Sequence, residues 1–143
     1  MEWNFKDGIP IYTQIIDEMT MRIASSAYAP GDKLPSVRDL ALDAGVNPNT
    51  MQRALAELER RGLVYSVRTS GRFVTKDVAV LKDLHEELAN KYFEELTEKL
   101  RKIGMDDKAI KASVNKWMEG IKSKGGREMA RIEINNLTKN FGD

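Results

Sequence analysis

Apolar residues recur every four positions after residue 10, which predicts a helix that opens at residues 9–12 and ends near Ala27. The stripe consists of Ile11, Ile15, Met19 and Ile23. Pro10 suits the first turn, where a missing backbone N–H costs nothing. Before this helix Trp3 and Phe5 alternate with polar residues, so we expect a short strand or a packing arm there.

Two shorter helices are predicted in close succession after the turn at Pro30-Gly31-Asp32. Ser36 is a good N-cap for the first, and Asp39 stands where a capping box can return the bond. Gly45 ends that helix, and Asn47 caps the next one, with Pro48 as its first residue.

The third helix is expected to run to about Arg61, with Gly62 directly after its end. Its core face follows the spacing i, i+3, i+4, i+7 at Met51, Ala54, Leu55 and Leu58. Two β-prone segments, 64–67 and 72–74, then surround Thr69-Ser70-Gly71 and indicate a hairpin. Helix, short helix, tight turn, helix and two-stranded ribbon together predict a winged helix-turn-helix.

Two amphipathic helices are expected next, over residues 78–103 and from Asp106 to about residue 121. A linker at 122–126 and a strand-like segment at 131–134 follow. We therefore expect a mainly α fold, in which residues 1–76 form a winged helix-turn-helix DNA-binding domain. A small two-helix dimerisation domain occupies 77–122, and residues 123–143 form a linker and tail.

Charge is unevenly distributed, although the formal net charge is only +1. Residues 33–76 hold eight basic and four acidic side chains, whereas residues 1–32 hold two basic and five acidic ones. A basic middle segment is typical of a site for a polyanion. With no cysteine and a single histidine, His85, the sequence excludes disulfides, thiol catalysis and a multi-histidine metal site.

Other sequence signals point to a cytoplasmic protein without a cofactor. The first residues lack the features of a secretory signal, and no apolar run is long enough for a membrane span. No phosphate-binding loop or other enzyme motif is found, so we expect no enzymatic activity. His85 is expected on a solvated surface, whereas Tyr92, Phe93 and Trp117 fit a core or a subunit interface better than an effector pocket.

Polar residues that suit DNA lie opposite the core face of the third helix. Amide side chains such as Asn49 and Gln52 can bind adenine, and Arg53 can bind guanine or a phosphate. Thr50, near the free N–H groups of the helix start, suits a phosphate oxygen. The predicted DNA contacts, with the start of the second helix and the wing included, are Ser36, Arg38, Asn49, Thr50, Gln52, Arg53, Gly71 and Arg72.

These residues resemble the GntR family of transcriptional regulators. The similar segments are Pro10-Ile11-Tyr12-x-Gln14-Ile15, Pro30-Gly31-x-x-Leu34-Pro35-Ser36-x-Arg38-x-Leu40-Ala41, Val46-Asn47-Pro48-Asn49-Thr50-Met51-x-Arg53-Ala54-Leu55 and Leu58-Glu59-x-x-Gly62-Leu63-Val64. The Asn47–Thr50 turn and the short helical C-terminal part look like the YtrA branch. Many members carry arginine at the positions of Pro48 and Gln52, so arginine base contacts are not transferred to these two, and Arg53 is the positive group that remains.

The resemblance implies a homodimeric regulator, usually a repressor, that binds an inverted repeat in double-stranded DNA. In the YtrA branch the targets are often neighbouring transporter operons. The tail from Ile132 to Asp143 looks like the first strand of an ABC-transporter ATPase, although chance similarity explains it equally well. The alternative function is a protein-interaction module that uses the winged helix to dock a protein partner.

Overall fold

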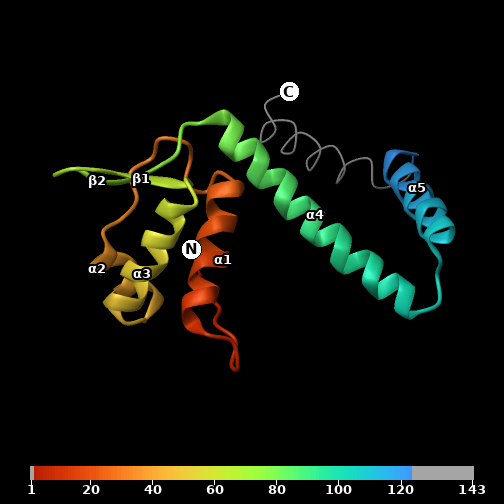
Figure 1. Ribbon diagram of the computed structural model, residues 1–143, viewed down its shortest axis with the longest axis horizontal. Helices are drawn as coiled ribbons and strands as arrows, with labels where there is room; N and C mark the ends of the chain where they lie inside the picture. The colour runs from red at the N-terminus through yellow and green to blue at the C-terminus, as the bar shows by residue number, and fades with distance from the viewer. Residues whose placement is uncertain (1, 124–143) are drawn as a thin grey trace. The chain divides into compact units, whose positions relative to one another are not determined.

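The computed structural model describes residues 2–123, and the chain divides after Leu84 into two compact units (Figure 1). Five helices and one two-stranded sheet occupy this part of the chain, which confirms the mainly α winged helix-turn-helix with helices after it. In chain order the elements are α1 (Ile11–Ala24), α2 (Val37–Ala44), α3 (Pro48–Arg60), β1 (Val64–Val67), β2 (Gly71–Val74), α4 (Val78–Lys102) and α5 (Asp107–Ser123). The domain limits at residues 76 and 122 stay predictions.

Helix α1 buries the face that its apolar stripe predicts, since Ile15, Met19 and Ile23 are almost inaccessible to solvent. It ends at Ala24, three residues before the expected Ala27. The reason is local, because Ser26 adopts a left-handed backbone conformation with φ +62°, which an α-helix cannot continue through.

Helices α2 and α3 begin at the caps that the sequence predicts. The Ser36 hydroxyl accepts a hydrogen bond from the Asp39 backbone N–H at 3.1 Å, and Gly45 ends α2 with φ +69°. The Asn47 side chain accepts from the Asn49 backbone N–H at 2.7 Å, directly before Pro48. Because of these two caps, only residues 45–47 separate the end of α2 from the start of α3.

The core of the first unit lies where α1, α3 and the sheet meet. All four predicted core residues of α3 are buried, and both α1 and α2 pack against this helix. The largest fully buried side chains are Ile15, Met19, Ile23, Met51, Leu55, Leu58 and Val74. Each buried side chain of this size contributes about 1.5–3 kcal/mol relative to exposure, so the core holds α3 firmly and leaves its opposite face free.

The wing is an antiparallel hairpin in which Val64 pairs with Val74 and Val67 pairs with Gly71. The segment before α2 joins it, because Leu34 N–H donates to the Arg72 carbonyl and Val74 N–H donates to the Asp32 carbonyl, both at 2.8 Å. This third line of backbone bonding was not predicted from the sequence. It ties the approach to α2 directly to β2.

Residues 2–9 form a packing arm and not a strand, so the structure decides between the two alternatives. The rings of Trp3 and Phe5 stack with centroids 5.7 Å apart. The arm contacts α1 and α2, which its alternation of aromatic and polar residues could not show.

The helices that follow the wing bury few side chains of their own. Within the described residues, Leu84 is the buried side chain of α4 and Ile110 that of α5. Asp106 caps α5 as expected, since it accepts from the Ala109 backbone N–H at 2.8 Å, and α5 extends to Ser123. Most of the expected linker, the strand at 131–134 and the tail lie outside the described residues.

Candidate nucleic-acid interface

The N-terminal half of α3 presents polar side chains to solvent. Asn49, Gln52 and Arg53 are exposed and Thr50 is half-buried, while the core face of the helix points into the unit. The first backbone N–H groups of a helix have no partner within it and carry a partial positive charge. The exposed half of α3 therefore offers amide and guanidinium donors together with the positive end of the helix, as an interface with DNA requires.

Arg53 is held toward α1 by an aromatic ring. Its guanidinium carbon lies 4.8 Å from the centroid of the Tyr12 ring, within the range of a cation–π contact. Stacking restrains the long side chain but leaves the in-plane N–H donors of the guanidinium able to bind a base or a phosphate. From the sequence, Tyr12 is part of the start of the first helix and of a segment that resembles the GntR family, and no local pattern places it beside Arg53.

On the other side of the exposed face, Arg72 of β2 reaches back to α3. Its Nη1 donates to the Gln52 Oε1 at 3.4 Å, and its Nε lies 3.5 Å from the Glu59 Oε1. Glu59 also accepts a hydrogen bond of 2.7 Å from the Ser66 hydroxyl on β1. Arg72 thus links the wing to α3. Its bond uses the oxygen of the Gln52 amide and not the nitrogen, which is the donor group.

The C-terminal half of α3 neutralises its own charge. Glu57 accepts hydrogen bonds from Arg60 and Arg61 at 2.6–2.7 Å. These bonds, from Arg60 first and then from Arg61, lower the pKa of Glu57 from 4.5 to about 2. The hydrogen bond from Glu57 likewise raises the pKa of Arg60. Free positive charge on α3 is therefore concentrated near Arg53.

A groove of about 750 Å³ lies between the tip of the wing and the start of α2. It brings together three of the predicted contacts, Ser36, Gly71 and Arg72. Lys33 and Ser70 line it as well. The cations, hydroxyls and accessible backbone of this groove are groups that bind a phosphate oxygen, and the lining also includes one carboxylate, that of Asp39.

Gly71 matters to the shape of this groove for two reasons. Its φ of +117° is a conformation that side chains with a Cβ rarely adopt, and a Cβ at this position would stand 3.2 Å from the Lys33 Cε. From the sequence, Lys33 is only one of the eight basic residues of the segment 33–76. Its place over the wing follows from the backbone pairing of residues 32–34 with β2, for which the sequence carries no short-range signal.

Two further arginines are next in sequence to residues that line the groove. Arg38 on α2 and Arg68 in the wing turn are exposed, and neither takes part in the ion pairs found within residues 2–123. Seven of the eight predicted contacts fall into two groups, and Arg38 belongs to neither. Four lie on α3, three line the groove, and Arg38 lies on α2 close to its start.

Residues 2–123 also bear on metal binding, membrane insertion and the predicted positions of His85 and the aromatic side chains. In the described part of the chain no three His, Asp or Glu side chains form a group that could hold a metal ion. No helix there is both long and apolar enough to cross a membrane. His85 is half-buried and not fully solvated, and Tyr92, Phe93 and Trp117 are exposed, so these aromatics are not core residues of a single chain.

Comparison with known proteins agrees with this geometry. The family of bacterial regulatory proteins named gntR matches residues 11–74. The HTH-type transcriptional regulator YhcF of Bacillus subtilis is 33% identical over 120 residues, which cover 84% of this chain and 99% of YhcF. The HTH-type transcriptional repressor YtrA of the same organism is 42% identical over 72 residues, or 50% of this chain and 55% of YtrA.

A solved structure extends the similarity beyond the winged helix. A GntR family transcriptional regulator from Listeria monocytogenes has a TM-score of 0.71 and 39% sequence identity, with 78% of this chain and 98% of that one covered. The match includes nearly the full length of that protein and a larger share of this chain than residues 11–74. This chain belongs to the gntR family of bacterial regulatory proteins and is a DNA-binding transcriptional regulator with a winged helix-turn-helix fold.

Proposed function

We propose that this chain is a homodimeric repressor that binds an inverted repeat with one α3 helix from each copy. The observation that carries the proposal is the row of exposed Asn49, Gln52 and Arg53 on a helix whose opposite face is buried. A major groove accommodates one α-helix, and these side chains match the hydrogen-bonding edges of bases. Thr50 and the groove beside Gly71 then bind the DNA backbone.

Exposed apolar side chains on α4 and α5 support dimerisation. They are Tyr92, Phe93 and Leu96 on α4 and Trp117 and Met118 on α5, with Ile103 directly after the end of α4, and each is more than 40% exposed in the single chain. Helices with so little buried surface need a partner to cover them, and a second copy related by a two-fold axis covers both sets at once. Two α3 helices in such a dimer would enter major grooves about one turn of DNA apart, or a multiple of it.

The regulated genes are proposed from relatives. YtrA, similar over the winged helix, is named a repressor, which supports negative control by this chain. The resemblance to the YtrA branch further supports a neighbouring ABC transporter operon as the target. A regulator of this kind acts where the chromosome is, so we place it in the cytoplasm, without a cofactor and without enzymatic activity.

Oligomeric state provides the first test. Sedimentation of the full chain should give the mass of a dimer, and Phe93→Glu should shift it to a monomer because the new charge would be buried at the interface. Lys91→Glu introduces the same side chain on a polar part of α4 and should leave the dimer intact. A monomeric wild type, or a Phe93→Glu variant that stays dimeric, contradicts the proposed interface.

Selection from random DNA tests the operator. We expect two half-sites in inverted orientation, protected by two chains, and a loss of the second half-site in the Phe93→Glu variant. Enriched sequences without two-fold symmetry would contradict the inverted repeat but leave DNA binding itself in place.

A further inference from the structure

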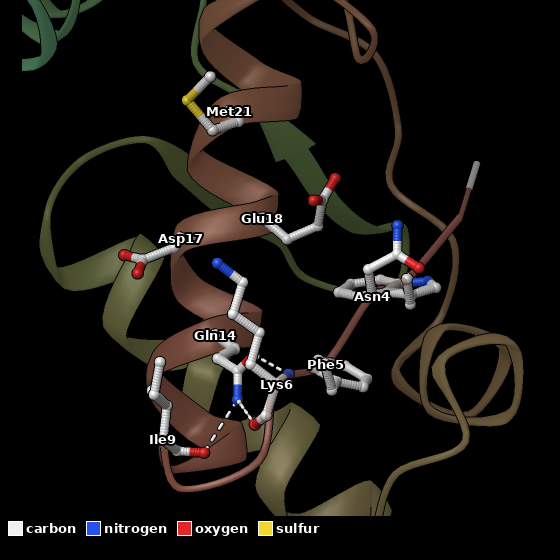
Figure 2. Close-up of a pocket in the computed structure, with 9 residues that line it drawn as sticks. Asn4, Phe5, Lys6, Ile9, Gln14, Asp17, Glu18 and Met21 are labelled. Carbon is white, nitrogen blue, oxygen red and sulfur yellow. Dashed lines mark hydrogen bonds between the residues drawn. The ribbon is translucent and has the colours of Figure 1, made fainter.

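Two side chains of α1 attach the N-terminal arm: Arg22 donates a hydrogen bond of 3.2 Å to the Glu2 carbonyl, and Gln14 bonds to the arm as a backbone segment would. The Gln14 carbonyl oxygen accepts from the Lys6 backbone N–H at 2.7 Å, and its amide nitrogen donates to the Lys6 carbonyl at 3.0 Å and the Ile9 carbonyl at 2.9 Å (Figure 2). Phe5, the residue before Lys6, is one of the side chains that line the pocket between the arm and α1 (Figure 2). The path of residues 3–6 is thus determined by specific bonds.

This attachment carries Trp3 to a position between two helices. Its ring covers the Arg22 guanidinium of α1, with 4.1 Å from the guanidinium carbon to the ring centroid. Its Nε1 donates a hydrogen bond of 3.0 Å to the Asp43 Oδ2 on α2. Arg22 is only 4% exposed and also pairs with Glu18 at 2.8 Å, so the α1 side of this link is rigid.

Helix α2 packs against α3 and its approach is bonded to β2, but its own buried face is small. It has eight residues, and only Leu40 and Ala41 are buried. Both α1 and α2 pack against α3, but in the described chain α1 and α2 share little direct contact. Trp3 bridges them from outside, and it lies before residue 11, where the match to the family begins.

We propose that Trp3 is a positioning residue for DNA binding. Through the bond to Asp43 it sets the angle of α2 against α1, and so it aims Ser36 and Arg38, at the start of α2, at the DNA backbone. The inference rests on the proposed contacts of these two residues with DNA. It assigns the arm a role in affinity in addition to its role in covering Arg22.

Three variants of the full chain test this link. Trp3→Phe keeps an aromatic ring over Arg22 but loses the N–H donor, and Asp43→Ala loses the acceptor. Each should bind its specific DNA about three- to tenfold more weakly, the value of one ordinary hydrogen bond, because the bond between Trp3 and Asp43 is exposed to solvent. The double variant should bind no more weakly than either single one.

If only charge mattered, removal of the Asp43 carboxylate would strengthen DNA binding. A weaker binding of Asp43→Ala therefore distinguishes positioning from a charge effect. Removal of a carboxylate reduces repulsion of DNA, so Asp17→Ala, which removes an exposed carboxylate of α1, should bind equally well or slightly better. Asp43→Asn keeps an oxygen that accepts from Trp3 and should retain most of the wild-type affinity. All titrations are made well below the unfolding temperature of each variant, so that a loss of stability does not enter.

A coupling measurement separates positioning from mere stabilisation. If Trp3 acts through the start of α2, Trp3→Phe should weaken binding little further in an Arg38→Ala chain, but fully in an Arg68→Ala chain. Unchanged affinity in Trp3→Phe and Asp43→Ala, or additive losses with Arg38→Ala, would overturn the inference. A wild-type chain that fails to bind any DNA would instead refute the proposed function.

Discussion

Replacement of Arg53 by alanine tests the part of the interface where free positive charge meets the polar face of α3. The guanidinium is exposed and rests 4.8 Å from the Tyr12 ring centroid, so it is restrained before DNA arrives. Loss of a base contact costs about 1–3 kcal/mol, which corresponds to a decrease of about five- to 150-fold in affinity. Tyr12→Leu keeps the cation but removes the stacking, worth about 0.5–1 kcal/mol, so it should weaken binding only about two- to fivefold.

Fluorescence anisotropy with a specific and an unrelated duplex, at several salt concentrations, distinguishes two modes of contact. If Arg53 reads a base, the loss falls on the specific duplex and the salt dependence stays the same. If it neutralises a phosphate, both duplexes lose affinity and the slope of log K against log salt falls by about 0.9.

Arg61→Ala serves as the matched control, since Glu57 already holds this arginine by a 2.7 Å ion pair at the far end of α3. It should bind within twofold of the wild type. An Arg53→Ala chain that stays within twofold on its specific duplex would refute the assignment of Arg53 to the interface.

Three further predictions concern the scaffold. Leu55→Ala should lower the free energy of unfolding by about 2–5 kcal/mol in urea titrations because the side chain is 1% exposed, whereas Leu42→Ala, 81% exposed, should change it by less than about 0.5 kcal/mol. Ser36→Ala removes the cap of α2 and should cost about 1 kcal/mol, seen as a lower unfolding midpoint. The pKa of Glu57, about 2 against 4.5, means that its ionised form stabilises the folded chain above about pH 4.5 and that this contribution is lost as the pH falls toward 2. The difference in urea midpoint between the wild type and Glu57→Gln should therefore be clear at pH 7 and shrink at pH 2–3, and a difference independent of pH would contradict it.

Local signals made the secondary structure predictable. The caps at Ser36 and Asn47 act on the backbone two or three residues away, so the sequence contains both partners of each bond. The core face of α3 follows from helical periodicity in the same way. The predicted end of α1 was wrong by three residues because Ser26 adopts φ +62°. Serine rarely adopts this conformation, so the sequence gives no sign of it.

Contacts between segments distant in the sequence could not be predicted. Lys33 lies over Gly71, Arg53 over Tyr12, and Trp3 reaches Asp43, 40 residues away. Each depends on how the elements pack, which no short pattern encodes. Residue type and helical face were therefore enough to nominate the polar groups of α3, but not to show which side chains hold them in place.

The most direct test of the whole account is a titration of the full chain with DNA from immediately upstream of its gene, against unrelated DNA, at two salt concentrations. A homodimeric regulator of neighbouring genes should prefer the upstream DNA, lose affinity steeply as salt rises and bind as two chains per site. Absence of binding to any DNA at low salt, or association that salt leaves unchanged, would contradict it and favour a winged helix that docks a protein partner.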